Sequence, residues 1–454
     1  MRAARVFSGW IACLSVFLAA GAGSSVVQPG RETGLPLRPG LPVERLLQGG
    51  ETHTYGVAVA AGRHLLVSVD QRGIDVVVAA TRPDGRALPA VDGPNGREGP
   101  ETLLIEGEAA GTWSIEVSSD SRAAPPGRYE IRTEELADST PEDRERLTAF
   151  GLLTEAARLF HLGTAEALDR SAARQLAALA CWRRLGDRRE EARALSTIAN
   201  IYASLGQARQ ALAAYRQALP LWQALHATGP AAATLTSIGL SLSSLGQGKD
   251  ALAAFEQAIE LRHSQADRYG MGLARNGVCL VLHTQGDLGA SLACSEEVRA
   301  LWHELGEAEL EAIALNNIGG VYGSTGEPAE AALRYRQALS VLRATGNRRG
   351  QAQALNNLGV VSAGAGELGQ ALAQYDEALA IFHEIGDRIW EARARHNIGA
   401  AYLSLGDPRR ATFQLEQALA LRHEAGDRRG EAISSDALGL ALARSGEPAR
   451  AIAL

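Results

Sequence analysis

The sequence has few residues of the kinds that often mark a chemical site. It contains four cysteines among 454 residues, and Lys249 is its only lysine. Arginine therefore carries nearly all the positive charge, a bias that a GC-rich genome produces and that we do not interpret further. With 52 acidic against 45 basic residues, the net charge is −7. This balance, without a basic stripe, argues against nucleic acid or an anionic membrane surface as the main partner.

Long apolar runs are absent after the first 22 residues. Those residues place Arg2 and Arg5 before an apolar stretch that ends in Ala20-Gly21-Ala22. The stretch is too short for a membrane span and has the order of a secretory signal peptide. We therefore predict a signal peptide over 1–22 and an exported mature chain, periplasmic or extracellular, without a transmembrane segment. Cys13 lies in a poor context for lipid attachment, so we do not expect a lipoprotein.

No combination of residues in the chain predicts an enzyme active site. A nucleophile, a base and an orienting group form no recognisable pattern, and the glycines do not follow strands as in a phosphate-binding loop. Four histidines share one position of the repeat described below, but equivalent atoms of stacked helices lie about 10 Å apart, whereas zinc ligands lie about 2 Å from the metal. We expect no catalytic residue, metal or cofactor. The four histidines are His263, His303, His383 and His423.

Three cysteines remain after removal of the signal peptide, and each stands where other repeats carry a small or apolar residue. Cys181 replaces leucine, Cys279 replaces glycine and Cys294 replaces alanine. Packing is sufficient to explain all three. Cys279 and Cys294 lie on the paired helices of one repeat, so a disulfide between them in an oxidising compartment is the alternative.

Glycine recurs every 40 residues through the second half of the chain, and a second glycine ladder is offset by 20 residues. Between the glycines, apolar residues follow helical spacing, as in Leu195, Ile198 and Tyr202. Glycine can adopt the left-handed conformation that ends a helix, and the acidic residue or proline that follows can begin the next one. The pattern predicts pairs of amphipathic helices. Structural roles are assigned to Gly206, Gly246, Gly286, Gly326, Gly366 and Gly406.

Small residues at the expected helix crossings help to decide which family of helical repeat the chain resembles. Gly319, Gly359 and Gly399 on first helices are expected to face Ala331, Ala371 and Ala411 on second helices. The run Ala-Leu-Asn-Asn-Leu-Gly over 354–359 resembles the tetratricopeptide repeat, although the usual unit has 34 residues. The longer unit is similar to the repeats of kinesin light chains and LGN-type scaffolds. The resemblance implies an all-α solenoid, a right-handed superhelix of helix pairs whose concave groove binds a protein or peptide.

The helical part divides into units by the same signals. Thr140-Pro141 begins a degenerate capping repeat over 140–186, with helices expected at about 142–161 and 165–184. Six regular repeats of 40 residues fill 187–426, and an incomplete seventh covers 427–454.

The residues before the helices alternate with the period of β-strands. About eight short segments such as Tyr55 to Val59 are separated by glycine and proline turns, which predicts an antiparallel β-sandwich over 43–136. The proline-rich stretch 23–42 is expected to be an exposed linker. Gly111-Thr112-Trp113 and Gly127-Arg128-Tyr129 resemble bacterial pre-peptidase C-terminal domains, some of which bind calcium. The aspartates here lack a calcium-loop spacing, so we interpret them as solvated turn residues.

Polar residues of the first helices give the candidate binding site. Asn317, Asn357 and Asn397 are assigned a structural role between neighbouring segments. Residues one position earlier, and others one turn away, are expected to point into the groove. Neutral amides with scattered arginines suit an extended peptide backbone and its acidic side chains. The predicted peptide-binding residues are Arg193, Ser196, Asn200, Asn276, Asn316, Gln353, Asn356, Arg393 and His396.

These patterns predict an exported bacterial scaffold that binds a peptide or partner domain, which the sequence does not identify. A second hypothesis comes from the order of signal peptide, sandwich and long repeats, which resembles the front part of bacterial proteins ending in a CHAT domain, a caspase-like peptidase. Because Leu454 falls within a helix, that hypothesis places the catalytic domain after residue 454. The repeats would then recruit substrate or regulate the peptidase.

Overall fold

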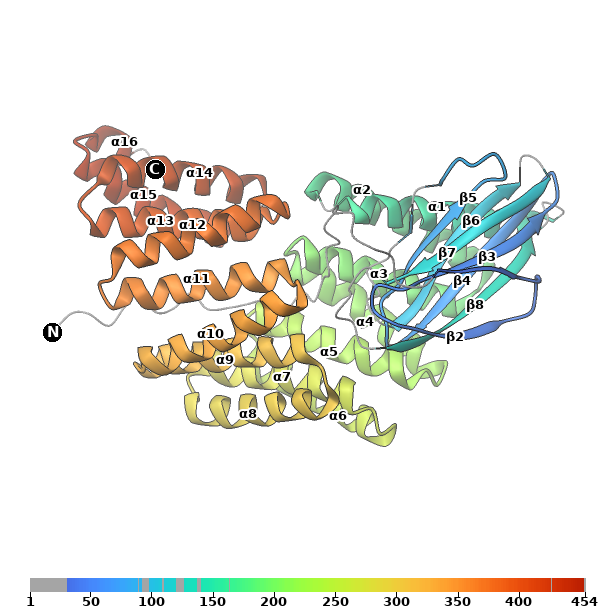
Figure 1. The fold of residues 1–454 in the computed structure, drawn as a ribbon, viewed down its shortest axis with the longest axis horizontal. Helices are drawn as coiled ribbons and strands as arrows, with labels where there is room; N and C mark the ends of the chain where they lie inside the picture. Colours follow the sequence, from blue (N-terminus) through green and yellow to red (C-terminus); the bar gives the residue numbers. More distant parts are fainter. Residues whose placement is uncertain are drawn as a thin grey trace. The chain divides into compact units, whose positions relative to one another are not determined.

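The computed structural model describes residues 31–88, 90–91, 98–107, 110–119, 126–136, 140–162, 164–425 and 427–452. The signal peptide predicted for 1–22 lies outside these residues. The chain forms two compact units, whose described parts are residues 31–262 and 263–452 (Figure 1). Each unit is described by itself.

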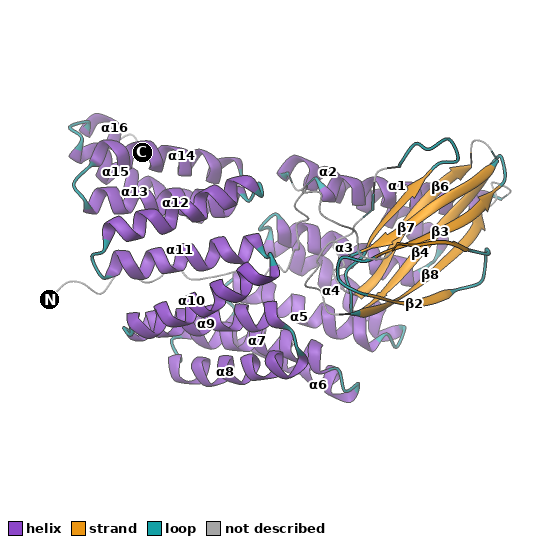
Figure 2. Ribbon diagram, viewed as in Figure 1, coloured by secondary structure: helices purple, strands orange, loops and turns teal. Residues whose placement is uncertain are grey.

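The first unit begins with two four-stranded sheets, drawn in orange in Figure 2. One sheet has the strand order β1-β3-β7-β5 and the other β2-β8-β4-β6. The predicted antiparallel sandwich is confirmed, with one parallel pair, β1 with β3. The strands are β1 (Arg31–Pro36), β2 (Val43–Leu47), β3 (Thr52–Val59), β4 (Arg63–Arg72), β5 (Val77–Thr81), β6 (Glu98–Gly107), β7 (Gly111–Ser118) and β8 (Gly127–Leu136).

Alternation along the strands places one side of each sheet in a shared core. In β3, Tyr55, Val57 and Val59 are buried while the residues between them are more exposed. Val67 of β4 and Ile115 of β7 belong to the same cluster, so both sheets contribute to one core. Burying each such side chain contributes roughly 1.5–3 kcal/mol.

The linker predicted for 23–42 is wrong for residues 31–36, which form β1. This edge strand pairs with β3, with Arg31 opposite Thr52 and Pro36 opposite Gly56. Proline is tolerated on an edge strand, because one side of that strand has no ladder bond to lose. Leu37 follows the strand and is 5% exposed in the core. The proline-rich composition therefore did not prevent this segment from joining the sheet.

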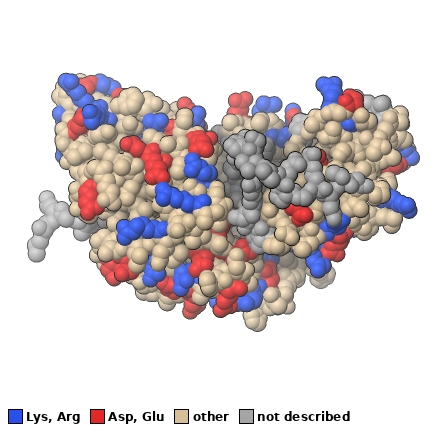
Figure 3. All heavy atoms as spheres, viewed as in Figure 1, with Lys and Arg blue, Asp and Glu red and all other residues tan. Residues whose placement is uncertain are grey.

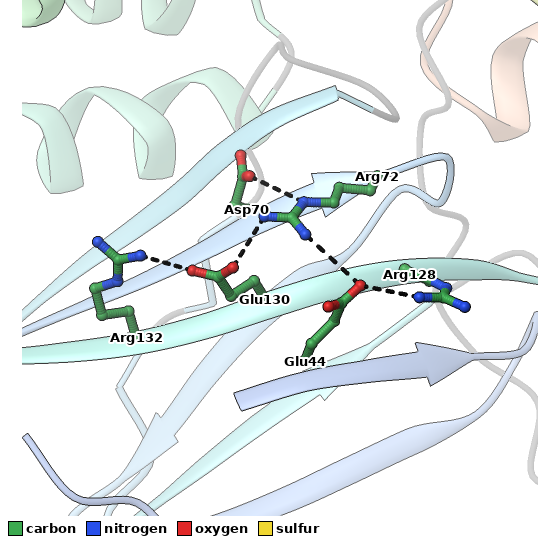
Figure 4. A network of polar contacts seen from close by, with 6 residues as sticks. All are labelled: Glu44, Asp70, Arg72, Arg128, Glu130 and Arg132. Atoms are coloured by element: carbon green, nitrogen blue, oxygen red, sulfur yellow. Dashed lines mark hydrogen bonds and ion pairs between the residues drawn. The ribbon is translucent and has the colours of Figure 1, made fainter. Parts of the chain in front are cut away.

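Six charged residues form a network across β2, β4 and β8 (Figure 4). Arg72 contacts Glu130 at 2.9 Å, Asp70 at 3.4 Å and Glu44 at 3.6 Å. Arg128 and Arg132 extend the network from Glu44 and Glu130. Three carboxylates face three guanidinium groups, and most of these side chains are well exposed, so each pair contributes only about 0–1 kcal/mol. We interpret the network as a solvated surface of the sheet.

The rest of the first unit is helical, and its first helix packs on the sandwich. The hydroxyl of Thr154 accepts a hydrogen bond from the backbone N–H of Leu104 in β6 at 3.3 Å, and Ala157 lies in the sandwich core. Thr140 caps this helix in a capping box with Asp143. The helices are α1 (Pro141–His161), α2 (Ala165–Leu185), α3 (Arg188–Ser204), α4 (Ala208–Ala224), α5 (Thr228–Ser244) and α6 (Gly248–Ser264), the last ending at the unit boundary.

The second unit consists of helix pairs in the predicted register, and the predicted fold class is confirmed. No helix among the described residues has the length and apolar character needed to cross a membrane. The helices are α7 (Arg268–Gln285), α8 (Leu288–Leu305), α9 (Ala308–Thr325), α10 (Pro328–Thr345), α11 (Arg348–Gly364), α12 (Leu368–Glu384), α13 (Arg388–Ser404), α14 (Pro408–Glu424), α15 (Arg428–Arg444) and α16 (Pro448–Ile452).

Glycines of two kinds shape the repeats. The six glycines from Gly206 to Gly406 that were assigned structural roles have φ between 71° and 84°, a conformation that other residues rarely adopt. The second kind lies inside first helices. A Cβ added to Gly359 would stand 2.5 Å from the ring of Tyr375, which lies one helical turn beyond the predicted Ala371 on α12. At Gly399 the predicted neighbour Ala411 does lie close, with its carbonyl oxygen 3.3 Å from the added Cβ.

Candidate functional site

The first helices of successive repeats in the second unit contact one another. α7 contacts α9, α9 contacts α11, α11 contacts α13, and α13 contacts α15. Because the repeat length is constant, equivalent side chains form rows along this surface. Two adjacent rows contain the asparagines that the sequence singled out. We call this surface the first-helix face.

Asparagine side chains of the two rows bond to one another between repeats. Nδ2 of Asn317 donates to Oδ1 of Asn276 at 3.0 Å, and Asn397 donates to Asn356 at 2.9 Å. Between these, Asn357 donates to Asn316 at 3.0 Å. Each bond joins residues 41 apart, one repeat plus one position. We call these six residues, Asn276, Asn316, Asn317, Asn356, Asn357 and Asn397, the asparagine ladder.

The ladder corrects part of the predicted groove. Asn276 is 6% exposed and Asn356 is 2% exposed, so neither projects freely into solvent. Their carbonyl oxygens are used by the next repeat, which explains the burial. Asn316 is half-buried. Among the described residues, no amide atom of the ladder is both sealed from solvent and without a partner.

The residues predicted in the first unit are engaged inside their own repeat. The hydroxyl of Ser196 accepts a hydrogen bond from Nε1 of Trp222 at 3.1 Å. The hydroxyl of Tyr215 donates to Oδ1 of Asn200 at 2.5 Å. Arg193 donates to Glu190, also at 2.5 Å. These contacts give Arg193, Ser196 and Asn200 a packing role within α3 and α4.

The remaining predicted residues lie on α11 and α13. Gln353 is half-buried on α11. Arg393 places its guanidinium carbon 4.6 Å from the ring centroid of Trp390. Nδ1 of His396 lies 3.3 Å from the hydroxyl of Ser434 on α15. Burial, together with the charges of Arg422 and Arg393, lowers the pKa of His396 to about 4, so its imidazole is neutral near pH 7.

Arg422 on α14 was missed by the sequence reasoning. It is 6% exposed, and burial lowers the pKa of its guanidinium. The same repeat position carries Trp302, Leu342 and Phe382 in the three preceding repeats and a buried arginine, Arg262, in the repeat before those. Two charged residues in a row of large apolar side chains were the available signal.

The side chains of His303, His383 and His423 are exposed, and each lies near a glutamate. His303 and His423 are 74% and 85% exposed, and Nδ1 of each lies 3.0 Å from a glutamate eight residues later. His383 repeats the arrangement with Glu391 at 3.3 Å. In the described part of the chain, no three His, Cys, Asp or Glu residues gather where they could hold a metal ion.

Cys279 on α7 and Cys294 on α8 form a disulfide with their Cα atoms 5.4 Å apart. The sequence had left this pairing as the alternative to simple packing. Cys181 is a buried free thiol, and burial together with a hydrogen bond to Glu145 raises the pKa of the thiol to about 11. Cys181 is therefore a poor nucleophile.

One face of the molecule shows how its charged side chains are distributed. On the face drawn in Figure 3, acidic and basic side chains are interspersed, without an extended area of either sign. A shallow depression of about 310 Å³ on α13 and α14 is lined by Tyr402, Arg409, Arg410, Phe413 and Gln414. Phe413 is 58% exposed there.

Three segments, 198–264, 270–344 and 350–424, match the tetratricopeptide repeat family. No protein with a curated description matches the chain. The resemblances to CHAT-domain proteins and to pre-peptidase C-terminal domains stay predictions.

Several solved structures are similar to this chain. Aspartyl phosphate phosphatase F from Bacillus subtilis is 14% identical, with a TM-score of 0.49, covering 63% of this chain and 76% of that one. The apo quorum sensor NprR from B. thuringiensis is 13% identical, with a TM-score of 0.49, covering 67% and 84%. A signal transduction ATPase with a tetratricopeptide repeat sensor from Pyrococcus horikoshii is 13% identical, with a TM-score of 0.46, covering 69% and 48%.

At such low identities and TM-scores, these likenesses tell nothing of this chain's ligand. The family match covers the helices that carry the asparagine ladder, and the 40-residue register agrees with it. The helical part of this chain is a solenoid of tetratricopeptide repeats.

Proposed function

We propose that this chain is an exported protein-interaction scaffold whose first-helix face binds an extended peptide. The observation that carries the proposal is the asparagine ladder. Each of its bonds uses one N–H and one carbonyl lone pair, whereas a primary amide has two N–H groups and two lone pairs. On the half-buried members Asn316, Asn317 and Asn397, the remaining groups offer donors and acceptors that a peptide backbone can pair with.

The spacing of the ladder suits an extended chain. Packed helices lie about 8–10 Å apart, and an extended peptide advances about 3.3 Å per residue. Each repeat would therefore meet about three peptide residues, and the three steps from α7 to α13 would meet about nine. The inter-repeat bonds hold the amides in fixed orientations before a peptide arrives, which reduces the entropy lost on binding.

Export is the second part of the proposal. The apolar stretch in residues 1–22 supports it as a signal peptide pattern. The disulfide between Cys279 and Cys294 supports it as well, since such bonds persist in oxidising compartments and are rare in the cytosol.

A peptide-capture experiment tests the binding proposal. Random nonapeptides displayed on phage are selected on the immobilised chain, and enriched sequences are then measured as synthetic peptides. The double variant Asn316→Ala with Asn357→Ala removes both partners of the middle ladder bond. We expect at least a tenfold loss of affinity in this variant.

Phe413→Ala is the matched control, because Phe413 is exposed on α14 and makes no ladder contact. Circular dichroism must show equal helix content in all three proteins. The proposal that the first-helix face binds a peptide would be contradicted if no peptide is enriched, or if the ladder variant binds the enriched peptides as tightly as wild type does.

A further inference from the structure

The disulfide between Cys279 and Cys294 stands at a helix crossing that other repeats build in a different way. In four repeats a glycine of the first helix lies under a large side chain of the second helix. A Cβ added to the glycine would stand 2.5–2.7 Å from that side chain. The large side chain therefore fills the crossing. The four pairs are Gly239 with Phe255, Gly319 with Tyr335, Gly359 with Tyr375, and Gly399 with Leu415.

The repeat formed by α7 and α8 differs at both positions of this pair. Cys279 stands where the other four repeats have glycine, and Ser295 stands where they have the large side chain. Ser295 is 3% exposed, so a small residue occupies a buried place that elsewhere holds a ring or a leucine. The disulfide to Cys294, the neighbour of Ser295, joins the two helices there. A covalent bond thus replaces packing, and its loss leaves the crossing underfilled.

A second contact joins the same two helices without sulfur. The ring of Trp302 on α8 lies over Gly272 on α7, where an added Cβ would stand 2.5 Å from it. The ring also meets the ring of Tyr269 edge-on, with centroids 5.5 Å apart. Reduction leaves this contact intact. We therefore expect reduction to loosen the crossing at Cys279 while α7 and α8 stay paired at Trp302.

Asn276 lies on α7 between Gly272 and Cys279, and so between the two contacts. It is 6% exposed, and its Oδ1 accepts the hydrogen bond from Nδ2 of Asn317 on α9 at 3.0 Å. This bond is the end of the asparagine ladder on the α7 side. The position of Asn276 depends on how α7 is held against α8. The disulfide therefore helps to hold this end of the ladder in place.

We propose that the disulfide between Cys279 and Cys294 is a redox switch for the asparagine ladder, whose reduction releases Asn276 from Asn317 and weakens peptide binding. This inference rests on the proposed function and adds its regulation. An oxidised chain holds the whole ladder in place before a peptide arrives, whereas a reduced chain must order the α7 end when it binds.

The reductant in this proposal is a dithiol. One of its thiolates attacks Sγ of Cys294, which is half-buried and more accessible than Cys279, at 2% exposed. The sulfur–sulfur bond breaks, and its electron pair stays on Cys279, which takes up a proton. The second thiol of the reductant then displaces Cys294 from the mixed disulfide. The reductant leaves oxidised as a disulfide, and both cysteines of the chain become thiols.

The first test follows the ladder without a peptide. The chain is labelled with ¹⁵N-asparagine, and the side-chain NH₂ resonances of Asn317 and Asn397 are identified by their loss in alanine variants. Dithiothreitol is then added, and alkylation with mass spectrometry counts the reduced cysteines. We expect Asn317 to shift in proportion to the reduced fraction. Asn397, which donates to Asn356, should not shift.

Three results of this test would overturn the switch. The disulfide could resist dithiothreitol in the folded chain. A fully reduced chain could leave the Asn317 resonances unshifted. Equal shifts of Asn317 and Asn397 would show that reduction disturbs the whole ladder rather than its α7 end.

The second test compares the affinity of the oxidised and the reduced chain for the best nonapeptide from the phage selection. We expect reduction to weaken binding about fivefold, which corresponds to about one net hydrogen bond. The matched control combines Cys279→Gly, Cys294→Ala and Ser295→Tyr, and so rebuilds the crossing of the neighbouring repeats. Its affinity should be the same with and without dithiothreitol. An equal loss in this control would show that the reductant acts elsewhere, and would overturn the switch.

The two tests separate this inference from the proposed function. Equal peptide affinity of the oxidised and reduced chains would overturn redox control of binding and leave the proposed function standing. A shift of Asn317 on reduction, in a chain that captures no peptide, would contradict the proposed function and still support the coupling between the disulfide and the ladder.

Discussion

Nδ2 of Asn357 on α11 donates to Oδ1 of Asn316 on α9 at 3.0 Å, joining two repeats through their side chains. We expect Asn357→Ala to lower the free energy of unfolding by about 1 kcal/mol, because the variant removes one partly buried hydrogen bond and leaves the Asn316 carbonyl to water. Urea unfolding measures the change. Gln353→Ala on the same helix is the control and should change stability by less than about 0.5 kcal/mol. Equal effects of the two variants would show that the ladder bond adds nothing.

Gly359→Ala should be destabilising by about 1–3 kcal/mol, because the new Cβ would stand 2.5 Å from the Tyr375 ring in a close-packed crossing. Hydrogen exchange should accelerate first in residues 347–386, since each repeat is held mainly by its neighbours. The control is Gly364→Ala, at the end of the same helix, where nothing lies within 4 Å of the added atom. That change should be neutral or slightly stabilising. Exchange that rises uniformly over the second unit would show that the unit unfolds as one block.

Reduction of the disulfide between Cys279 and Cys294 should lower stability by about 3 kcal/mol, the value expected for closing a loop of roughly 15 residues. The two cysteines are 15 residues apart and tie α7 to α8. Thermal unfolding with and without dithiothreitol measures the effect. The double variant Cys279→Ala with Cys294→Ala should have the melting temperature of the reduced wild type, and dithiothreitol should not change it. An unchanged melting temperature on reduction would contradict the bond.

Glu391 should make stability depend on pH in the acid range. It is 2% exposed, and burial by itself raises its pKa, but hydrogen bonds from Arg395 and His383 outweigh burial and bring the pKa below its ordinary value of 4.5. A carboxylate with a lowered folded-state pKa adds stability above its unfolded pKa and loses it as pH falls through the folded pKa. Glu391→Gln should therefore unfold with a flatter pH dependence below pH 5.

Asp376→Asn is the control of opposite sign and smaller size, because partial desolvation raises the pKa of Asp376 although its side chain is exposed to solvent. Its protonation favours the folded state, so the wild-type residue costs stability as pH rises through the unfolded pKa. The asparagine variant should lose that dependence. Urea unfolding from pH 3 to pH 6 gives the free energy of unfolding of wild type and of both variants. The same pH dependence in all three proteins would contradict these assignments.

The helical architecture could be predicted because the signals are local and repeated. Gly286 and Gly326 end helices by their own conformation, and Asp387 caps the next helix through its own side chain. A constant spacing then fixes which helices pair. The position of Tyr375 over Gly359 was not predicted, since it depends on how a side chain leans across a crossing. The edge strand β1 was missed because amino-acid composition alone does not show which segment of the chain pairs with the edge of a sheet.

The candidate site could be predicted only in part. The sequence placed Asn316 and Asn357 in adjacent rows, but not the bond between them, which depends on the offset of one repeat against the next. Burial of Asn356 follows from that bond. The setting of Arg422 needs three helices at once, α13, α14 and α15, and no single segment of sequence contains it.

The most direct test of the central claim is to watch the ladder amides when a peptide binds. A chain labelled with ¹⁵N-asparagine shows the side-chain NH₂ resonances, which single alanine variants assign, and the best nonapeptide from the phage selection is then added. We predict saturable shifts of Asn316, Asn357 and Asn397 with one dissociation constant, equal to the constant from direct binding. Saturated peptide binding that leaves all ladder amides unshifted would contradict the account.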